Sequence, residues 1–159
     1  MKISIISVGK LKEAYLADGI KEYAKRLSKY CQIEEIVLQD EPIKDKSSEA
    51  LNLQIKEKEG LRIIDAINPK SYVIALDLKG RMLTSEELAS KMLEIQTYNS
   101  SHISFIIGGS LGLSEAVLNK ANYRLCFSKM TFPHQLMKLI LFEQIYRAFK
   151  INNNETYHK

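Results

Sequence analysis

One stretch of the chain, residues 127–135, combines side chains and spacing that suit a ligand site. It reads Phe-Ser-Lys-Met-Thr-Phe-Pro-His-Gln and joins a β-type segment, residues 123–127, to a long apolar helix that we expect to begin at Pro133. Irregular segments rich in large apolar side chains need an apolar cover, and they often line binding sites. The alternative is a buried strand-to-helix connection without a ligand. The stretch therefore indicates either an apolar pocket or a covered loop.

A second stretch, Gly108-Gly-Ser-Leu-Gly112, follows a strand-like apolar run. It lets a ligand approach the backbone, because glycine has no Cβ and tolerates unusual φ and ψ angles. Its spacing differs from G-x-G-x-x-G, and the Gly-Lys-Ser/Thr of a P-loop is absent. A plain turn is the alternative. The spacing argues against a nicotinamide cofactor and a P-loop nucleotide, and it leaves other ligands open.

Polar groups that could act on a nucleic acid lie near the end of the chain. Glu143 and Arg147 stand four positions apart in the last predicted helix, where an intrahelical ion pair is the ordinary interpretation. The chain ends in Tyr-His-Lys, residues 157–159, and these groups together can stack on a base and contact a phosphate. The alternative is a frayed terminus. His134, in the first turn of the same helix, either hydrogen-bonds near a ligand or is structural.

Alternating strand and helix patterns place these segments in a fold. Strands are predicted at residues 2–8, 33–38, 71–78, 102–107 and 123–127, with a turn at 79–81, and helices at residues 16–27, 49–67, from 84 onward, 114–119 and 133–151. This order predicts one α/β domain, residues 1–159, with a mostly parallel sheet flanked by helices. Ligands of such sheets bind at the carboxyl ends of strands. We therefore expect residues 76–78, 108–112 and 127–132 to meet around one site.

The last predicted helix is apolar on nearly every side, with large apolar residues at most positions from Leu136 to Phe149. A surface helix needs only one apolar stripe, so this helix must be covered twice. The second cover is either more of the same chain or a second copy of the protein. Because 159 residues leave little material to enclose a helix completely, we expect a homodimer.

Composition is ordinary for a soluble globular protein: 45% hydrophobic and 26% charged residues, with a net charge of +4. The apolar start, residues 3–8, is too short for a signal peptide or a membrane span. Cys31 and Cys126 are isolated, which predicts reduced structural thiols in a cytoplasmic protein and no metal site. Basic residues gather in 10–29 and acidic residues in 34–49. This asymmetry suits a polyanionic partner but does not require one.

Taken together, these motifs make the sequence similar to the RlmH family. These SPOUT-superfamily enzymes methylate N3 of a pseudouridine in large-subunit (23S) ribosomal RNA. The resemblance covers the whole chain and is carried by Val8-Gly-Lys-Leu-Lys12, Gly108-Gly-Ser-Leu-Gly-Leu-Ser114, Ser128-Lys-Met-Thr-Phe-Pro-His-Gln135, Glu143-Gln-Ile-Tyr-Arg-Ala148 and the terminal Tyr157-His-Lys159. The family's tail has a glycine, and often a proline, before Tyr-His-Lys, where this chain has Asn153 and Thr156.

The resemblance implies a SPOUT-type homodimer with a C-terminal trefoil knot, a rare topology that no periodicity indicates. It implies ribosomal RNA as the partner; we expect the assembled ribosome as the substrate, and free ribosomal RNA is the alternative. It also implies a cofactor, S-adenosylmethionine, bound without a metal by Leu76, Gly108, Phe127, Ser128, Lys129, Met130, Thr131 and Phe132. For the RNA we predict that His158 lies nearest the target base, that Tyr157 stacks, and that Arg147 and Lys159 contact phosphate.

Two alternatives stay open. A SPOUT enzyme that acts on another RNA, such as a transfer RNA, would keep the cofactor site and change the substrate. A non-enzymatic ribosome-binding factor would bind RNA without transferring a methyl group. Binding of S-adenosylmethionine to the pure protein separates the second alternative from an enzyme.

Overall fold

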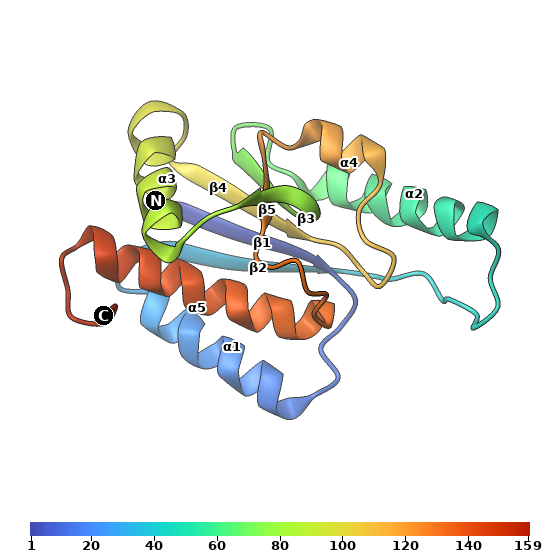
Figure 1. Ribbon diagram of the computed structural model, residues 1–159, viewed down its shortest axis with the longest axis horizontal. Helices are drawn as coiled ribbons and strands as arrows, with labels where there is room; N and C mark the ends of the chain where they lie inside the picture. The colour runs from blue at the N-terminus through green and yellow to red at the C-terminus, as the bar shows by residue number, and fades with distance from the viewer.

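Five parallel strands form one sheet in the computed structural model, which describes residues 1–159 (Figure 1). The strands are β1 (Lys2–Val8), β2 (Gln32–Leu38), β3 (Tyr72–Met82), β4 (His102–Ile107) and β5 (Tyr123–Cys126). Their order across the sheet is β2-β1-β4-β3-β5, and every neighbouring pair is parallel. The predicted α/β class with a parallel sheet is confirmed.

Helices cover both faces of this sheet. They are α1 (Ala14–Leu27), α2 (Glu49–Ala66), α3 (Ser85–Tyr98), α4 (Glu115–Lys120) and α5 (His134–Asn152). Helices α1, α3 and α5 pack on one face over the larger apolar core, and α2 and α4 pack on the other over a smaller one (Figure 1). None of the helices has both the length and the hydropathy that crossing a membrane requires.

The central strands are apolar at nearly every position because both of their faces are covered. In β1, Ile3 and Ile5 point into the larger core, whereas Ile6 and Val8 point into the smaller one. Strand β4 is buried along its whole length, and Phe105 is among the largest fully buried side chains. The continuous apolar runs of the sequence therefore mark the middle of the sheet.

Helix starts follow the capping residues of the sequence. Thr84 accepts the N–H of Glu87, and the Glu87 carboxylate accepts the N–H of Thr84, so the two residues form a capping box. Ser114 caps α4 in the same way by accepting the N–H of Val117. Helix α5 begins at His134, one residue later than predicted, because Pro133 keeps an extended backbone with ψ of 133°.

Strand β3 is longer than predicted, and the predicted turn at residues 79–81 is wrong. Leu76 pairs with Leu125, and pairing then resumes with Arg81 opposite the same residue, so that residues 77–80 form a bulge inside the strand. Gly80 permits this bulge, because a Cβ there would lie 2.7 Å from the carbonyl carbon of Arg124. Residues 79–81 have the composition of a turn, but pairing with β5 extends the strand beyond them to Met82.

A buried lysine connects α5 to the edge strand β2. Lys138 is 2% exposed, and its Nζ lies 2.5 Å from Glu35 Oε2 without a further hydrogen bond. Removing one partner of such a pair leaves an uncompensated buried charge, whereas an apolar replacement of the charged group costs little. We expect Glu35→Ala to lower the free energy of unfolding by about 3 kcal/mol, and Lys138→Met to change it by less than about 1 kcal/mol.

Urea unfolding measures both values. Glu22→Ala, which removes the exposed partner of Arg26, is the control and should cost at most about 1 kcal/mol. Equal losses in Glu35→Ala and Lys138→Met would contradict this account of the pair.

Candidate functional site

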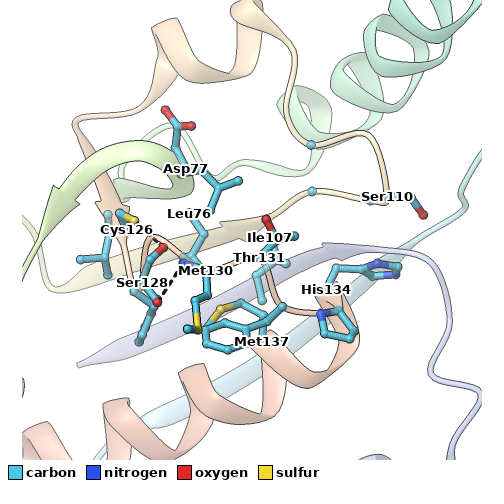
Figure 2. Close-up of a pocket in the computed structure, with 18 of the residues that line it drawn as sticks. Leu76, Asp77, Ile107, Ser110, Cys126, Ser128, Met130, Thr131, His134 and Met137 are labelled. Carbon is cyan, nitrogen blue, oxygen red and sulfur yellow. Dashed lines mark hydrogen bonds between the residues drawn. The ribbon is translucent and has the colours of Figure 1, made fainter.

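A cavity of about 640 Å³ opens at the carboxyl ends of β4 and β5 and at the bulge of β3, the strand between them in the sheet (Figure 2). Its lining residues are Leu76, Asp77, Leu78, Ile107, Gly108, Gly109, Ser110, Leu111, Gly112, Leu125, Cys126, Phe127, Ser128, Met130, Thr131, Phe132, Pro133, His134 and Met137. The strand ends predicted to meet therefore do meet. The volume lies within the range of about 300–1,000 Å³ that is usual for small-molecule sites.

Most of the residues expected to bind a cofactor line this cavity. They are Leu76, Gly108, Phe127, Ser128, Met130, Thr131 and Phe132. Lys129 is the one member of the predicted set that is not part of the lining. Cys126, expected to be structural only, and Met137 of α5 also line the cavity and were not predicted as site residues. Cys126 directly precedes the apolar loop, and this position in the sequence could have indicated that it lines the cavity.

The glycine wall of the cavity is a loop that folds back on itself. Gly112 N–H donates to Gly109 O at 3.0 Å, and Gly112 has a positive φ of 84°. A Cβ on Gly108 would lie 2.8 Å from both the carbonyl carbon and the oxygen of Gly112. Backbone crowding thus requires glycine at position 108. The loop of residues 108–112 is both the turn after β4 and one wall of the cavity.

The opposite wall is the apolar loop after β5. Cys126 Sγ donates to the carbonyl of Ser128 at 3.0 Å, and Ser128 Oγ accepts the N–H of Met130 at 3.0 Å, so short-range bonds fix the loop (Figure 2). The Met130 side chain is 73% exposed although it lines the cavity. A large apolar group at the solvent side of the cavity can close over an apolar ligand.

Two ionisable groups besides Cys126 line the cavity. Asp77 Oδ1 accepts the N–H of Lys79 at 3.2 Å, but Oδ2 is buried and has no hydrogen-bond partner, with Arg124 Nη1 3.9 Å away. At that distance Asp77 and Arg124 form a loose ion pair, and the buried Oδ2 is not exposed to the cavity. Burial lowers the pKa of His134, and the nearby Asp40 only partly opposes this, so the ring is neutral at pH 7.

The C-terminal residues fold back onto α5 and do not fray. The ring of Tyr157 packs edge-on against Tyr146 with centroids 4.9 Å apart, and its hydroxyl donates to Glu143 Oε1 at 3.0 Å. The guanidinium of Arg147 lies over the same ring, 4.7 Å from the centroid. Burial and the Glu143 carboxylate raise the pKa of Tyr157. Glu143 and Arg147 also form the expected ion pair, with Nη2 and Oε1 2.6 Å apart.

His158 is held between two charged side chains. Its Nδ1 lies 3.1 Å from Arg147 Nη1, and its Nε2 lies 2.7 Å from Glu86 Oε1. A guanidinium can only donate, so Nδ1 accepts and the Nε2–H donates to Glu86. The same bond lowers the pKa of Glu86. Both ring nitrogens are therefore occupied in this arrangement.

The backbone turn into the tail is centred on Asn154. We assigned the family's glycine position to Asn153, but its φ is −96°, and the positive φ of 53° falls on Asn154. Asparagine tolerates this left-handed region. Glu155 then accepts from Tyr30 and Lys150, at 2.9 and 2.7 Å, and fastens the tail.

Within one chain the tail is remote from the cavity. None of Arg147, Tyr157, His158 and Lys159 lines it. Arg147 follows His134 by 13 positions along α5, which corresponds to about 20 Å of helix. The structure thus brings the predicted cofactor residues together in one place and the predicted RNA-contacting residues in another.

Side chains that commonly bind metals are not clustered. No group of three or more His, Cys, Asp or Glu side chains is arranged to hold an ion. Cys31 and Cys126 are both free and buried, and burial raises the pKa of the Cys31 thiol to about 11. The Cys31 thiol is therefore protonated at pH 7, in agreement with the structural role predicted for it.

Comparison with known proteins shows similarity to methyltransferases over nearly the whole chain. Residues 1–158 match a family described as predicted SPOUT methyltransferase. The chain is 58% identical, over the full length of both proteins, to the Ribosomal RNA large subunit methyltransferase H of Clostridium botulinum (strain Alaska E43 / Type E3). It is 55% identical over the full length to the protein of the same name from Clostridium acetobutylicum.

Among solved structures, a probable methylase family protein from Haemophilus influenzae Rd KW20 superposes with a TM-score of 0.55. The match covers 99% of this chain and 70% of that one, at 16% sequence identity. The similarity concerns the fold.

Proposed function

The chain belongs to the SPOUT methyltransferase family, and from this premise we propose that it transfers a methyl group from S-adenosylmethionine to N3 of a pseudouridine in large-subunit ribosomal RNA. The observation that carries the proposal is the cavity at the ends of β4 and β5 and the bulge of β3, where nearly all residues expected to bind the cofactor converge. Relatives more than half identical to the chain over its full length bear the name of a ribosomal RNA methyltransferase, which supports the choice of substrate.

The cavity suits S-adenosylmethionine in size and chemistry. The apolar loop, residues 127–132, offers cover for the adenine ring, and the glycine wall, residues 108–112, offers backbone groups within reach. When bound, the cofactor supplies a methyl group already activated by its sulfonium, so the protein need provide neither a metal nor a covalent nucleophile.

The remaining task of the protein is to orient the base and receive the N3 proton. N3 of pseudouridine lies between two carbonyls and is acidic enough to lose its proton with help, and alignment with the methyl group supplies much of the rate. We propose that His158 accepts the N3 proton of the pseudouridine. Its Nδ1 is occupied by Arg147 in the free protein. An RNA phosphate that binds the guanidinium of Arg147 would release Nδ1 as an acceptor.

The separation between tail and cavity favours a homodimer. Because the tail lies about 20 Å along α5 from the cavity, His158 can reach a bound methyl group if a second copy contributes its tail. The α5 face that α1 and α3 leave partly exposed includes Leu136 and Ile140, which can be covered by that copy. We therefore propose a cytoplasmic dimer with shared sites. The trefoil knot stays a prediction.

Transfer of labelled methyl from S-adenosylmethionine tests the function directly. The substrates are ribosomes from a strain that lacks this protein and, in parallel, protein-free ribosomal RNA. We expect label on intact ribosomes, mapped to a pseudouridine of the large subunit, and little label on free RNA. Label on transfer RNA alone would redirect the proposal to another substrate. No transfer to any RNA, despite cofactor binding, would favour a non-enzymatic ribosome-binding factor.

A further inference from the structure

Two consecutive residues of α2 lie directly behind the glycine wall of the cavity. A Cβ on Gly109 would lie 3.2 Å from Glu59 Oε1, and a Cβ on Gly60 would lie 2.3 Å from Ser114 Oγ. Gly109 lies near the start of the loop, and Ser114 caps the helix that follows it. Helix α2 therefore contacts the loop near both of its ends. Neither Glu59 nor Gly60 lines the cavity.

The carboxyl of Glu59 is buried to an extent that needs an explanation. The residue is 3% exposed, its Oε2 accepts the N–H of Glu41 at 3.0 Å, and its Oε1 has no hydrogen-bond partner. Arg62 is nearby but binds Glu41 and the carbonyl of Gln39. An unpaired buried oxygen costs stability, and such groups often mark a functional constraint.

The charges around Glu59 favour its neutral form. Burial raises the pKa of the carboxyl, and the carboxylates of Asp40 and Glu41 act in the same direction, against Arg62 and the Glu41 N–H. The stability contributed by a group with a raised pKa is present at low pH and is lost as the pH rises through that pKa. Ionisation would place a negative charge behind Gly109 and beside the carboxylates of Asp40 and Glu41.

We propose that Glu59 is a positioning residue of the cofactor site. Its carboxyl links the loop after β2, through Glu41, to the back of Gly109, and this contact sets the position of the glycine wall. The inference rests on the proposed function, because it takes S-adenosylmethionine as the ligand of the cavity. It adds a residue outside the cavity, acting through Gly109, to those that determine cofactor affinity.

The first test uses Glu59→Ala, Glu59→Gln and, as a matched control, Glu57→Ala at an exposed position of the same helix. Amide hydrogen exchange of residues 108–113 is measured without ligand, and S-adenosylmethionine binding is measured by calorimetry. We expect Glu59→Ala to speed exchange in this loop and to weaken binding about tenfold. Glu57→Ala should change neither, and Glu59→Gln should keep near-normal binding, because its amide has the shape of the protonated carboxyl.

The pH dependence of S-adenosylmethionine affinity distinguishes a positioning role of Glu59 from a purely structural one. As the pH rises above the ordinary pKa range of a carboxyl group, wild-type affinity should fall relative to Glu59→Gln, since Glu59 ionises and glutamine cannot. A double-mutant cycle of Glu59→Ala and Gly109→Ala is a second test, because a Cβ on residue 109 would contact the Glu59 carboxyl. In the Glu59→Ala background, Gly109→Ala should cost less affinity than in the wild type.

The outcomes separate the two proposals. Equal exchange and equal affinity in Glu59→Ala and Glu57→Ala, or additive effects in the cycle, would overturn the role of Glu59. If Glu59→Ala does not fold, Glu59→Gln and Gly109→Ala decide the question through the pH dependence and the exchange rates. A wild-type protein that binds no S-adenosylmethionine would overturn the proposed function, whereas the ligand-free exchange data would still report whether Glu59 holds the loop.

Discussion

Gly108→Ala is expected to abolish measurable binding of S-adenosylmethionine, a loss of at least about 100-fold in affinity. The added Cβ would lie 2.8 Å from the backbone carbonyl of Gly112 and 3.0 Å from Leu113 Cδ2. Backbone atoms cannot give way as a side chain can, so the loop must move. Because the same loop forms one wall of the cavity, its movement changes the shape of the site.

Gly19→Ala provides the control. Its Cβ would meet the side chain of Leu139, with Cδ1 2.9 Å away, where α1 packs on α5 and outside the cavity. A flexible side chain can rotate away, and alanine favours a helix over glycine by about 1 kcal/mol. Calorimetry should therefore give wild-type affinity for Gly19→Ala. Normal binding by a folded Gly108→Ala protein would argue that the ligand lies elsewhere.

His158→Ala is expected to reduce the methyl-transfer rate on ribosomes by about 10²- to 10⁴-fold, the usual contribution of a positioned proton acceptor. Affinity for S-adenosylmethionine should stay within about twofold, because the side chain does not line the cavity of its own chain. Single-turnover kinetics and calorimetry measure the two effects separately. Thr156→Ala, two positions earlier in the same tail and exposed, is the control. A near-normal rate in His158→Ala would remove this residue from the mechanism.

Mixing the two inactive variants tests whether the site is shared. In a two-fold dimer, a Gly108→Ala chain would contribute its intact tail to the intact cavity of a His158→Ala chain. Random pairing at equal amounts should then restore about a quarter of wild-type activity. No recovery after mixing would mean that each cavity is served by its own tail or that the chains do not exchange.

The sequence by itself determined the order of the elements, most of their boundaries and the class of the sheet. Continuous apolar runs marked β1 and β4, and the capping residues Thr84 and Ser114 fixed the starts of α3 and α4. It also identified the strand ends that line the cavity, since carboxyl ends of parallel strands meet at one edge. These features depend on periodicity and on contacts between near neighbours, which a sequence displays directly.

Tertiary structure alone decided the features that depend on distant residues. The bulge at residues 77–80 exists because β3 pairs with β5, and the burial of Glu59 behind Gly109 joins segments 50 positions apart. The tail is ordered by contacts of His158 with Glu86 and of Glu155 with Tyr30. No local sequence pattern predicts such pairs, because helix and strand periodicity at each residue is the same whether or not its distant partner is present. Packing brings the partners together and makes these contacts part of the site.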